Sequence, residues 1–333
     1  MAALIAAFSI SLPRPADATY LPQERIPTDS PIYRDLERLA ASYGAAPRFL
    51  SSRPLRRAEA RAYLRNLAEA NPGVEADPAY ARAARWVDPD AAGATGPWGV
   101  VRDDEEEERL EISPYASILY SDDPRNEPEV NRDYRVGVAA AAALDTSSVV
   151  VVNLYEGTAS QGGRGTPDFG DFNSLIEGVN FNSYVNEAYV EVPVSKIRLL
   201  FGHAWLRWGP GATGTLALSD AAPALDMLRA EAGMLGVVRY SQFLALLDPG
   251  PETYLAGHRL EWQPSGRLSV GLTELARFDG TSQVPLYLIP FVPYSYWEKR
   301  PKTGGVTPAD SSGNALRKNN VLWSADVAWS IRP

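Results

Sequence analysis

The feature that most constrains this chain is an alternation of apolar and polar residues with a period of two, which begins near residue 111 and continues to residue 331. In the segment 321–331, the odd positions carry Val, Trp, Ala, Val, Trp and Ile, and the even positions carry mostly Ser, Asp and Ala. Successive side chains of a β-strand point to opposite faces, so this period predicts strands with one apolar face and one polar face. No run of about 18 apolar residues occurs, which excludes a helical membrane span. The sequence therefore predicts a mainly β protein.

The same alternation recurs in about ten segments between residues 111 and 331. Clear examples are 132–144, 184–192, 196–202, 259–263 and 268–272. The apolar face is often aromatic near strand ends, and the opposite face mixes Arg, Glu, Ser, Gly and Ala. This pattern is typical of strands whose outer face meets lipid and whose inner face is polar. It favours a partial antiparallel transmembrane β-barrel over residues 111–333, and a soluble β-structure remains the alternative.

The N-terminal segment 1–18 is predicted to be an export signal. An apolar stretch over residues 2–12 is followed by Ala16-Asp17-Ala18, which has the small-residue spacing of a cleavage site. Export of a barrel protein would place it in the outer membrane of a Gram-negative cell. We therefore expect that localisation, with the residues after the signal in the periplasm.

Residues 19–90 are predicted to form a small helical subdomain in the periplasm. Its three helices are expected at residues 31–43, 54–69 and 78–87. Ile32, Leu36 and Leu39 share one face of the first helix, and Gly44 ends it. In the second helix, four arginines lie opposite the leucines, and we interpret this arginine face as a solvated surface. These arginines are Arg56, Arg57, Arg61 and Arg65.

Residues 91–110 are predicted to be an acidic linker, because the segment is rich in Gly and Pro and includes the acidic run 103–108. The whole chain has 41 acidic and 32 basic residues, a formal net charge of -9 and no Cys. Nucleic acid binding, a Cys-based zinc site and a thiol nucleophile are therefore not expected. Nothing in the sequence indicates a metal or another cofactor.

The densest motif lies between residues 202 and 226. Trp205 and Trp208 offer ring faces for sugar C–H groups, and Arg207, Asp220 and Asp226 offer hydrogen bonds to hydroxyls or carboxylates. We interpret Gly209-Pro210-Gly211 as a tight structural turn. A second aromatic run adds the candidate binding residues Tyr294, Tyr296 and Trp297. For Trp208, the alternative to sugar binding is a structural role, in which its ring packs against the turn.

The run from Trp208 to Asp226 resembles the signature segment of the Wzi-like capsule assembly proteins. The segments 258–274 and 32–39 are also similar to that family. The resemblance implies an outer-membrane barrel lectin with a periplasmic helical bundle, which binds capsular polysaccharide without transforming it. It also implies a barrel with more strands than this sequence offers, so we expect that further strands follow residue 333. The expected partners are surface polysaccharide and outer-membrane lipid, and the expected state is a monomer.

Two alternatives remain open from the sequence. One is a porin-like channel. The other is a polysaccharide-processing glycoside hydrolase, for which Glu261 and Glu274 are the best carboxylate pair if they face each other across the hairpin 258–274. No hydrolase motif accompanies His203 or His258. We therefore predict a protein that is not an enzyme and has no catalytic residues.

Overall fold

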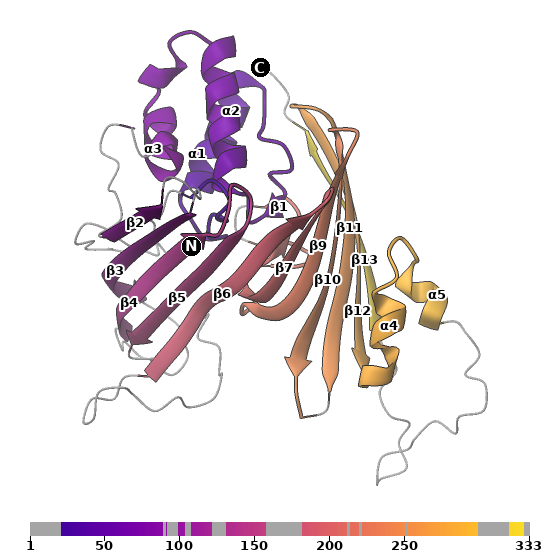
Figure 1. Ribbon diagram of the computed structural model, residues 1–333. Helices are drawn as coiled ribbons and strands as arrows, with labels where there is room; N and C mark the ends of the chain where they lie inside the picture. Colours follow the sequence, from indigo (N-terminus) through magenta and orange to yellow (C-terminus); the bar gives the residue numbers. More distant parts are fainter. Residues whose placement is uncertain are drawn as a thin grey trace, which may run out of the picture.

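The computed structural model describes residues 21–88, 91, 99–103, 108–121, 131–157, 182–211, 214–219, 222–250, 252–298 and 320–329. The predicted export signal and Asp220 lie outside these residues. The described part is mainly β, with one large antiparallel sheet and a small N-terminal helical region, as the alternation predicts (Figure 1). Among the described residues, no helix has the length and apolar character needed to cross a membrane.

The large sheet has eleven strands in the order β13-β12-β11-β10-β9-β7-β6-β5-β4-β3-β2, and all neighbouring strands are antiparallel. The strands are β2 (Gly99–Asp103), β3 (Glu108–Ser121), β4 (Asn131–Ala143), β5 (Val149–Gly157), β6 (Asn182–Val194), β7 (Ile197–Ala204), β9 (Leu225–Met234), β10 (Val238–Asp248), β11 (Thr253–Ser265), β12 (Leu268–Asp279) and β13 (Asn320–Trp329). The sheet is not closed into a barrel, and β2 and β13 are its two edges in the described part of the chain. β2 lies inside the segment that the sequence predicts to be a linker.

The helical subdomain consists of α1 (Ile32–Tyr43), α2 (Arg57–Ala70), the short 3₁₀ helix η1 (Val74–Ala76) and α3 (Pro78–Val87). Gly44 ends α1 as predicted, with a φ of 69° and its N–H donated to the carbonyl of Ala40 at 2.9 Å. α2 begins later than predicted because the preceding residues pair elsewhere. Ser52 and Arg53 form the short strand β1, and the carbonyl of Leu55 accepts the N–H of Ile26 at 2.8 Å.

The arginine face of α2 is only partly solvated. Arg61 is exposed and pairs with Asp88, as expected of a surface residue. Arg57 is buried, and its guanidinium donates to Glu24 at 3.1 Å and to the carbonyl of Trp86. The prediction of a solvated face is therefore wrong for Arg57, because this position turns toward the segment that precedes α1.

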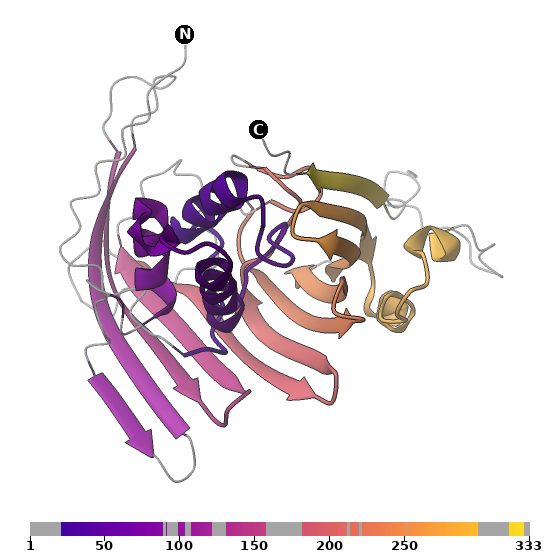
Figure 2. The same cartoon turned by 90° about the horizontal axis from the view of Figure 1, so that it is seen from above.

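The sheet curves around the helical subdomain, so its two faces meet different surroundings (Figure 2). We call the face toward the helices the inner face and the opposite one the outer face. Exposed large apolar side chains gather on the outer face: Val136, Val138, Leu154, Val185, Phe201, Leu228, Leu260, Trp262, Leu272, Trp323, Val327 and Trp329. The inner face carries small residues and buried charged ones. The alternation predicted this division, including inward Arg259 and Glu261 beside outward Leu260 and Trp262.

The two ends of the sheet also differ. At one end, short connections join the strands, and the helical subdomain contacts several of them. Gln23 donates to the carbonyl of Asp145 at 3.1 Å, Arg48 donates to the carbonyl of Gly236, and Ala46 donates its N–H to the carbonyl of Gly266 at 2.7 Å. We call this the helical end. At the opposite, distal end, the connection 249–252 is short, and the other four connections are longer and span residues 122–130, 158–181, 205–224 and 280–319.

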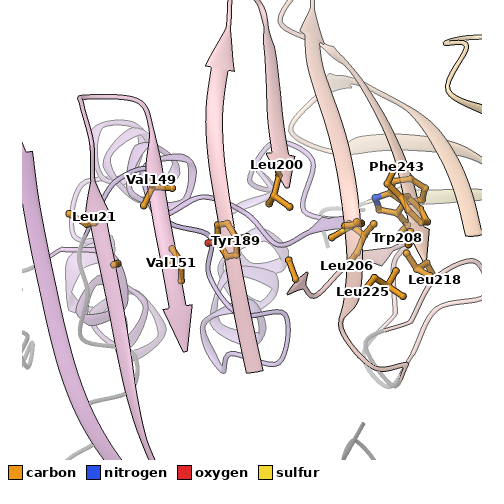
Figure 3. Packing of buried hydrophobic residues seen from close by; sticks show 14 of the residues in the cluster. Leu21, Val149, Val151, Tyr189, Leu200, Leu206, Trp208, Leu218, Leu225 and Phe243 are labelled. Carbon is orange, nitrogen blue, oxygen red and sulfur yellow. The ribbon is translucent and has the colours of Figure 1, made fainter. Parts of the chain in front are cut away.

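An apolar core fills the inner face below the helical subdomain (Figure 3). Figure 3 shows Val149, Val151, Tyr189, Leu200 and Phe243 projecting from their strands into this cluster, with Trp208 against Phe243. Burial of apolar surface from both the strands and the 205–224 connection therefore holds that connection inside the curve of the sheet.

Candidate functional site

Buried ion pairs join the helical subdomain to the inner face near the helical end. Nε of Arg25 lies 2.5 Å from Oε2 of Glu191 on β6, and both side chains are buried. Arg25 also donates to the carbonyl of Pro54 at 2.9 Å, and its main-chain N–H donates to the hydroxyl of Tyr189 at 3.2 Å. Buried charges require such pairing because the loss of hydration is expensive. Arg25 therefore ties the chain before α1 to the middle of the sheet.

A second group of charges continues this network toward α2. Arg229 donates to Oε2 of Glu231 at 2.6 Å, and Nε of Arg239 lies 3.8 Å from Oε1 of Glu231. Arg239 also pairs with Glu59 of α2 and stacks 4.3 Å above the centre of the Phe49 ring. Glu59 thus joins a helix to the sheet through one carboxylate.

The surroundings of Glu59 change its protonation. Burial alone raises the pKa of its carboxyl, but the charges of Arg239 and Arg56 and a hydrogen bond from the Arg56 N–H outweigh burial. The net result lowers the pKa of Glu59 from 4.5 to about 2. Glu59 is therefore ionised at neutral pH in the contact between α2 and the sheet.

A third polar group lies where β1 meets the sheet. Glu261 accepts hydrogen bonds from Ser51 at 2.6 Å, from Ser269 at 2.9 Å and from Ser52. Nη1 and Nη2 of Arg259 donate to the two carboxylate oxygens of Asp326 on β13, at 2.6 and 2.9 Å. These contacts satisfy charges that would otherwise be costly on a buried face, so they have a structural role.

The glycine-rich motif folds back into the curve of the sheet. β8 (Arg207–Trp208) leaves the end of β7 and pairs antiparallel with β1, with Ser52 opposite Trp208 and Arg53 opposite Arg207. The next residue, Gly209, donates its N–H to the carbonyl of Ser51 at 2.8 Å and has a φ of 116°. This φ favours glycine, because residues with a Cβ rarely adopt it, and a Cβ would also lie 3.3 Å from the Thr215 side chain.

Position 211 also requires glycine, because the backbone leaves no room for a Cβ. Its φ is 149°, and a Cβ on it would lie 2.2 Å from the carbonyl oxygen of Gly214. The turn Gly209-Pro210-Gly211 also lines a cavity of about 190 Å³ beside Ser51 and Arg53. The structural interpretation of these three residues is therefore supported by close backbone packing.

Trp208 and Arg207 are both buried. The Trp208 ring has no exposed surface and packs edge-on against Phe243, with ring centres 5.2 Å apart. The Arg207 guanidinium donates to the carbonyl of Gly211 and so closes the turn from inside. These contacts favour the structural alternative for Trp208 and give Arg207 a similar role. Neither side chain offers a surface to a sugar in this arrangement.

Trp205 and Asp226 lie together at the distal end. The Trp205 ring is half-buried, and its Nε1 donates to the carbonyl of Asn186, at a bulge of β6. Asp226 is exposed on β9, and its Oδ1 lies 2.8 Å from Nδ1 of His203 on β7. His203 and Asp226 are also register partners in neighbouring strands. We call Trp205, His203 and Asp226 the distal rim.

The second predicted aromatic run lies on the outer face. Tyr294 is fully buried, with its ring centre 4.4 Å from that of His258, so it offers no surface to a sugar. Tyr296 is exposed, Trp297 is half-buried, and their rings meet edge-on at 5.1 Å. Because Trp208 lies inside the sheet and Tyr294 lies outside it, the predicted candidates do not form one site.

The carboxylate pair considered for the hydrolase alternative, Glu261 and Glu274, does not face across the hairpin. Glu261 lies opposite Gly271, and Glu274 lies opposite His258. Glu261 points to the inner face and contacts Ser51, whereas Glu274 points to the outer face and lies 3.0 Å from His258. Glu261 and Glu274 are thirteen positions apart, and the hairpin has a bulge between Trp262 and Ser265. Because a bulge shifts the strand register, the sequence alone does not show whether the two carboxylates share a face.

Several features were not found by sequence reasoning. Arg229 and Glu231 lie on β9, Arg239 lies on β10 and Arg25 precedes α1, so only strand order and docking of the subdomain bring these four charges together. A cavity of about 440 Å³ lies at the helical end between α2 and the β11–β12 turn, and none of the predicted site residues lines it. In the described part of the chain, no group of three or more His, Asp and Glu side chains is placed to hold a metal ion.

Comparison of the chain with protein-family models found no match, and neither did comparison with curated proteins or with solved structures.

Proposed function

We propose that this chain is an outer-membrane protein that binds surface polysaccharide and assists capsule assembly and attachment. In this proposal the described strands are part of a transmembrane β-barrel, and the helical subdomain lies on the periplasmic side. The observation that carries the proposal is the distribution of side chains on the sheet. Large apolar residues are exposed on the outer face, whereas charged residues are buried on the inner face.

This distribution is the reverse of a water-soluble sheet packed on a core. Phe201 is 67% exposed and Trp329 is 69% exposed, although both lie in regular strands. An exposed apolar surface of this extent is unfavourable in water and favourable against lipid. The short connections at the helical end and the longer connections that make up four of the five at the distal end agree with bacterial barrels, which have short periplasmic turns and longer outer loops.

The polysaccharide part of the proposal rests on the distal rim and on the resemblance of residues 208–226 to the capsule assembly family. An indole face and an exposed carboxylate are suited to sugar C–H groups and hydroxyls. Asp226 is exposed at this rim, and the Trp205 ring is partly exposed there. The porin-like alternative is less favoured, because the helical subdomain lies over one end of the curved sheet (Figures 1 and 2). Leu206 and Trp208 are also buried against the inner face.

The membrane part is tested by alkaline carbonate washing of membranes from expressing cells. We expect the full chain to remain in the membrane pellet and to require detergent for release. A chain recovered in the carbonate supernatant contradicts the proposal and favours the soluble alternative.

The binding part is tested by retention of purified capsular polysaccharide on the detergent-folded full chain. We expect Trp205→Ala and Asp226→Asn each to reduce retention about ten-fold, because each removes a contact worth about 1 to 2 kcal/mol. The matched controls are Trp86→Ala and Glu69→Gln in the helical subdomain, which should retain polysaccharide as the unmodified chain does. Equal retention by all four variants contradicts binding at the distal rim. Shortening of the polysaccharide with time favours the hydrolase alternative.

A further inference from the structure

The segment 280–298 crosses the outer face of β10, β11 and β12, and we call it the strap. It contains the short helices η2 (Thr281–Gln283), α4 (Val284–Tyr287) and α5 (Tyr294–Glu298). Figure 1 shows α4 and α5 beside the lower half of β12, on the side away from the helical subdomain. The Phe278 and Tyr287 rings stack with centres 3.9 Å apart, which fixes the strap on the sheet.

The strap covers polar side chains that point outward from the sheet. Glu274 of β12 has no exposed surface and accepts the main-chain N–H groups of Tyr294 at 2.8 Å and Ser295 at 3.0 Å. Its neighbour His258 lies 3.0 Å from the same carboxylate. Gln242 of β10 donates to the carbonyl of Tyr287 at 2.8 Å. The strap backbone therefore provides hydrogen-bond partners for a polar patch on the outer face.

Several main-chain positions of the strap either donate to a partner or carry no N–H. Pro285, Pro290 and Pro293 have no N–H to satisfy. The N–H of Phe291 donates to the Tyr240 hydroxyl at 3.1 Å, and the N–H of Ile289 donates to the carbonyl of Leu286 at 3.4 Å. Irregular backbone is tolerated next to hydrocarbon only when its polar groups find such partners.

The outward side of the strap is apolar. Leu286, Leu288, Ile289 and Phe291 are all exposed, and Phe291 is 62% exposed. The strap thus buries Gln242, His258 and Glu274 and presents leucine, isoleucine and phenylalanine side chains instead. Replacing polar surface with apolar surface in this way is unfavourable in water and favourable against an apolar medium. The new surface continues the apolar outer face formed by Leu260 and Leu272 of the adjoining strands.

We propose that the strap is a membrane-embedded element whose Leu286–Phe291 side chains contact the hydrocarbon of the lipid bilayer. This inference rests on the proposed membrane location of the sheet and adds to it a lipid-binding surface outside the regular strands. Glu274 is the anchor of the strap, because one carboxylate holds two of its main-chain N–H groups.

The absence of Cys from the sequence allows a direct test with a single nitroxide label. Phe291→Cys places the label on the strap, Phe201→Cys places it on the outer face of β7, and Leu216→Cys places it on the 205–224 connection, where Leu216 is 93% exposed. The labelled full chains are reconstituted in phosphatidylcholine vesicles. Their accessibility to oxygen, which partitions into lipid, is compared with that to a water-soluble nickel chelate.

We expect residues 201 and 291 to favour oxygen several-fold over the nickel chelate, and residue 216 to favour the chelate. A water-accessible label at 291 with a lipid-accessible label at 201 overturns the strap inference and leaves the membrane proposal intact. Water-accessible labels at both 201 and 291 overturn the membrane proposal. Exclusion of both reagents at 291 shows that protein covers the strap, which also overturns the inference.

A second set of variants tests the anchor. Adding Glu274→Ala to the Phe291→Cys chain should make the label several-fold more mobile, and Gln242→Ala should do so to a smaller extent. Glu69→Ala on α2 is the matched control and should leave the label unchanged. A label of unchanged mobility in both Glu274→Ala and Gln242→Ala overturns the role of this polar patch in holding the strap.

Discussion

Arg25 and Glu191 form a buried ion pair, with Nε and Oε2 2.5 Å apart, that joins the chain preceding α1 to β6 in the sheet. Arg198 approaches the other carboxylate oxygen of Glu191 at 3.3 Å, and Glu231 lies 3.7 Å from Arg25. The pair is therefore part of a network in which each charge depends on the others. Loss of one member leaves its partners buried without compensation.

Arg25→Ala is expected to lower the free energy of unfolding by about 3 to 5 kcal/mol, because it leaves Glu191 and Glu231 undercompensated. Urea unfolding of the detergent-folded chain measures this change. Arg61→Ala is the matched control, since Arg61 is half exposed in its pair with Asp88. Its expected loss is below about 1 kcal/mol. Equal losses in the two variants contradict the importance of the buried network.

The contact between α2 and the sheet should weaken in acid. The pKa of Glu59 is lowered to about 2 in the folded chain, from 4.5, so its ionised form stabilises the fold above pH 4.5. This stabilisation is lost as the pH falls from 4.5 to about 2. Protease resistance of residues 21–88, measured against pH, reports the docking of the subdomain. The Glu59→Gln variant should lose less protease resistance between pH 4.5 and about 2 than the unmodified chain does. The same pH dependence in both proteins contradicts the role of Glu59 in docking.

The two tryptophans of the motif should behave differently. Trp208→Ala is expected to destabilise the chain by about 3 to 5 kcal/mol, because it removes a fully buried ring. Trp205→Ala should cost less, since its ring is half-buried, yet it should reduce polysaccharide retention per folded molecule. Thermal unfolding and retention measured on the same preparations separate these effects. A larger loss of stability in Trp205→Ala than in Trp208→Ala contradicts this assignment.

Gly202→Ala should disrupt the pairing of β6 and β7. Gly202 has a φ of +136°, and a Cβ on it would lie 2.2 Å from the carbonyl oxygen of Ala188. Backbone strain and overpacking together are expected to cost about 2 to 5 kcal/mol. Gly233→Ala is the control, because a Cβ there meets nothing within 4 Å. The yield of folded protein and its urea midpoint should fall in Gly202→Ala and remain nearly unchanged in Gly233→Ala.

The faces of the strands were predictable because alternation is a local property. Arg259 and Glu261 point inward and Leu260 and Trp262 point outward, as their spacing of two requires. The end of α1 at Gly44 was predictable for the same reason, since a glycine at a helix C-terminus adopts a positive φ readily.

The contacts between distant segments were not predictable. Arg57 follows the spacing of a surface arginine, yet it is buried because Glu24 and the carbonyl of Trp86 meet it from other parts of the chain. Glu274 appeared to be a partner for Glu261, but the register of β11 and β12 places His258 opposite it. These contacts depend on strand order and on how the subdomain docks, and neither can be predicted from a local sequence pattern.

The pairing of β1 with β8 has a consequence for how the chain reaches its folded state. Ser52, between α1 and α2 of the subdomain, pairs through a short ladder with Trp208, which lies between β7 and β9. Contacts between residues so distant in sequence form slowly, because a long loop must close before they form. β1 and β8 have each other as partners only when both segments are in place. The short ladder therefore makes the ordering of the segment between α1 and α2 depend on the ordering of the segment between β7 and β9.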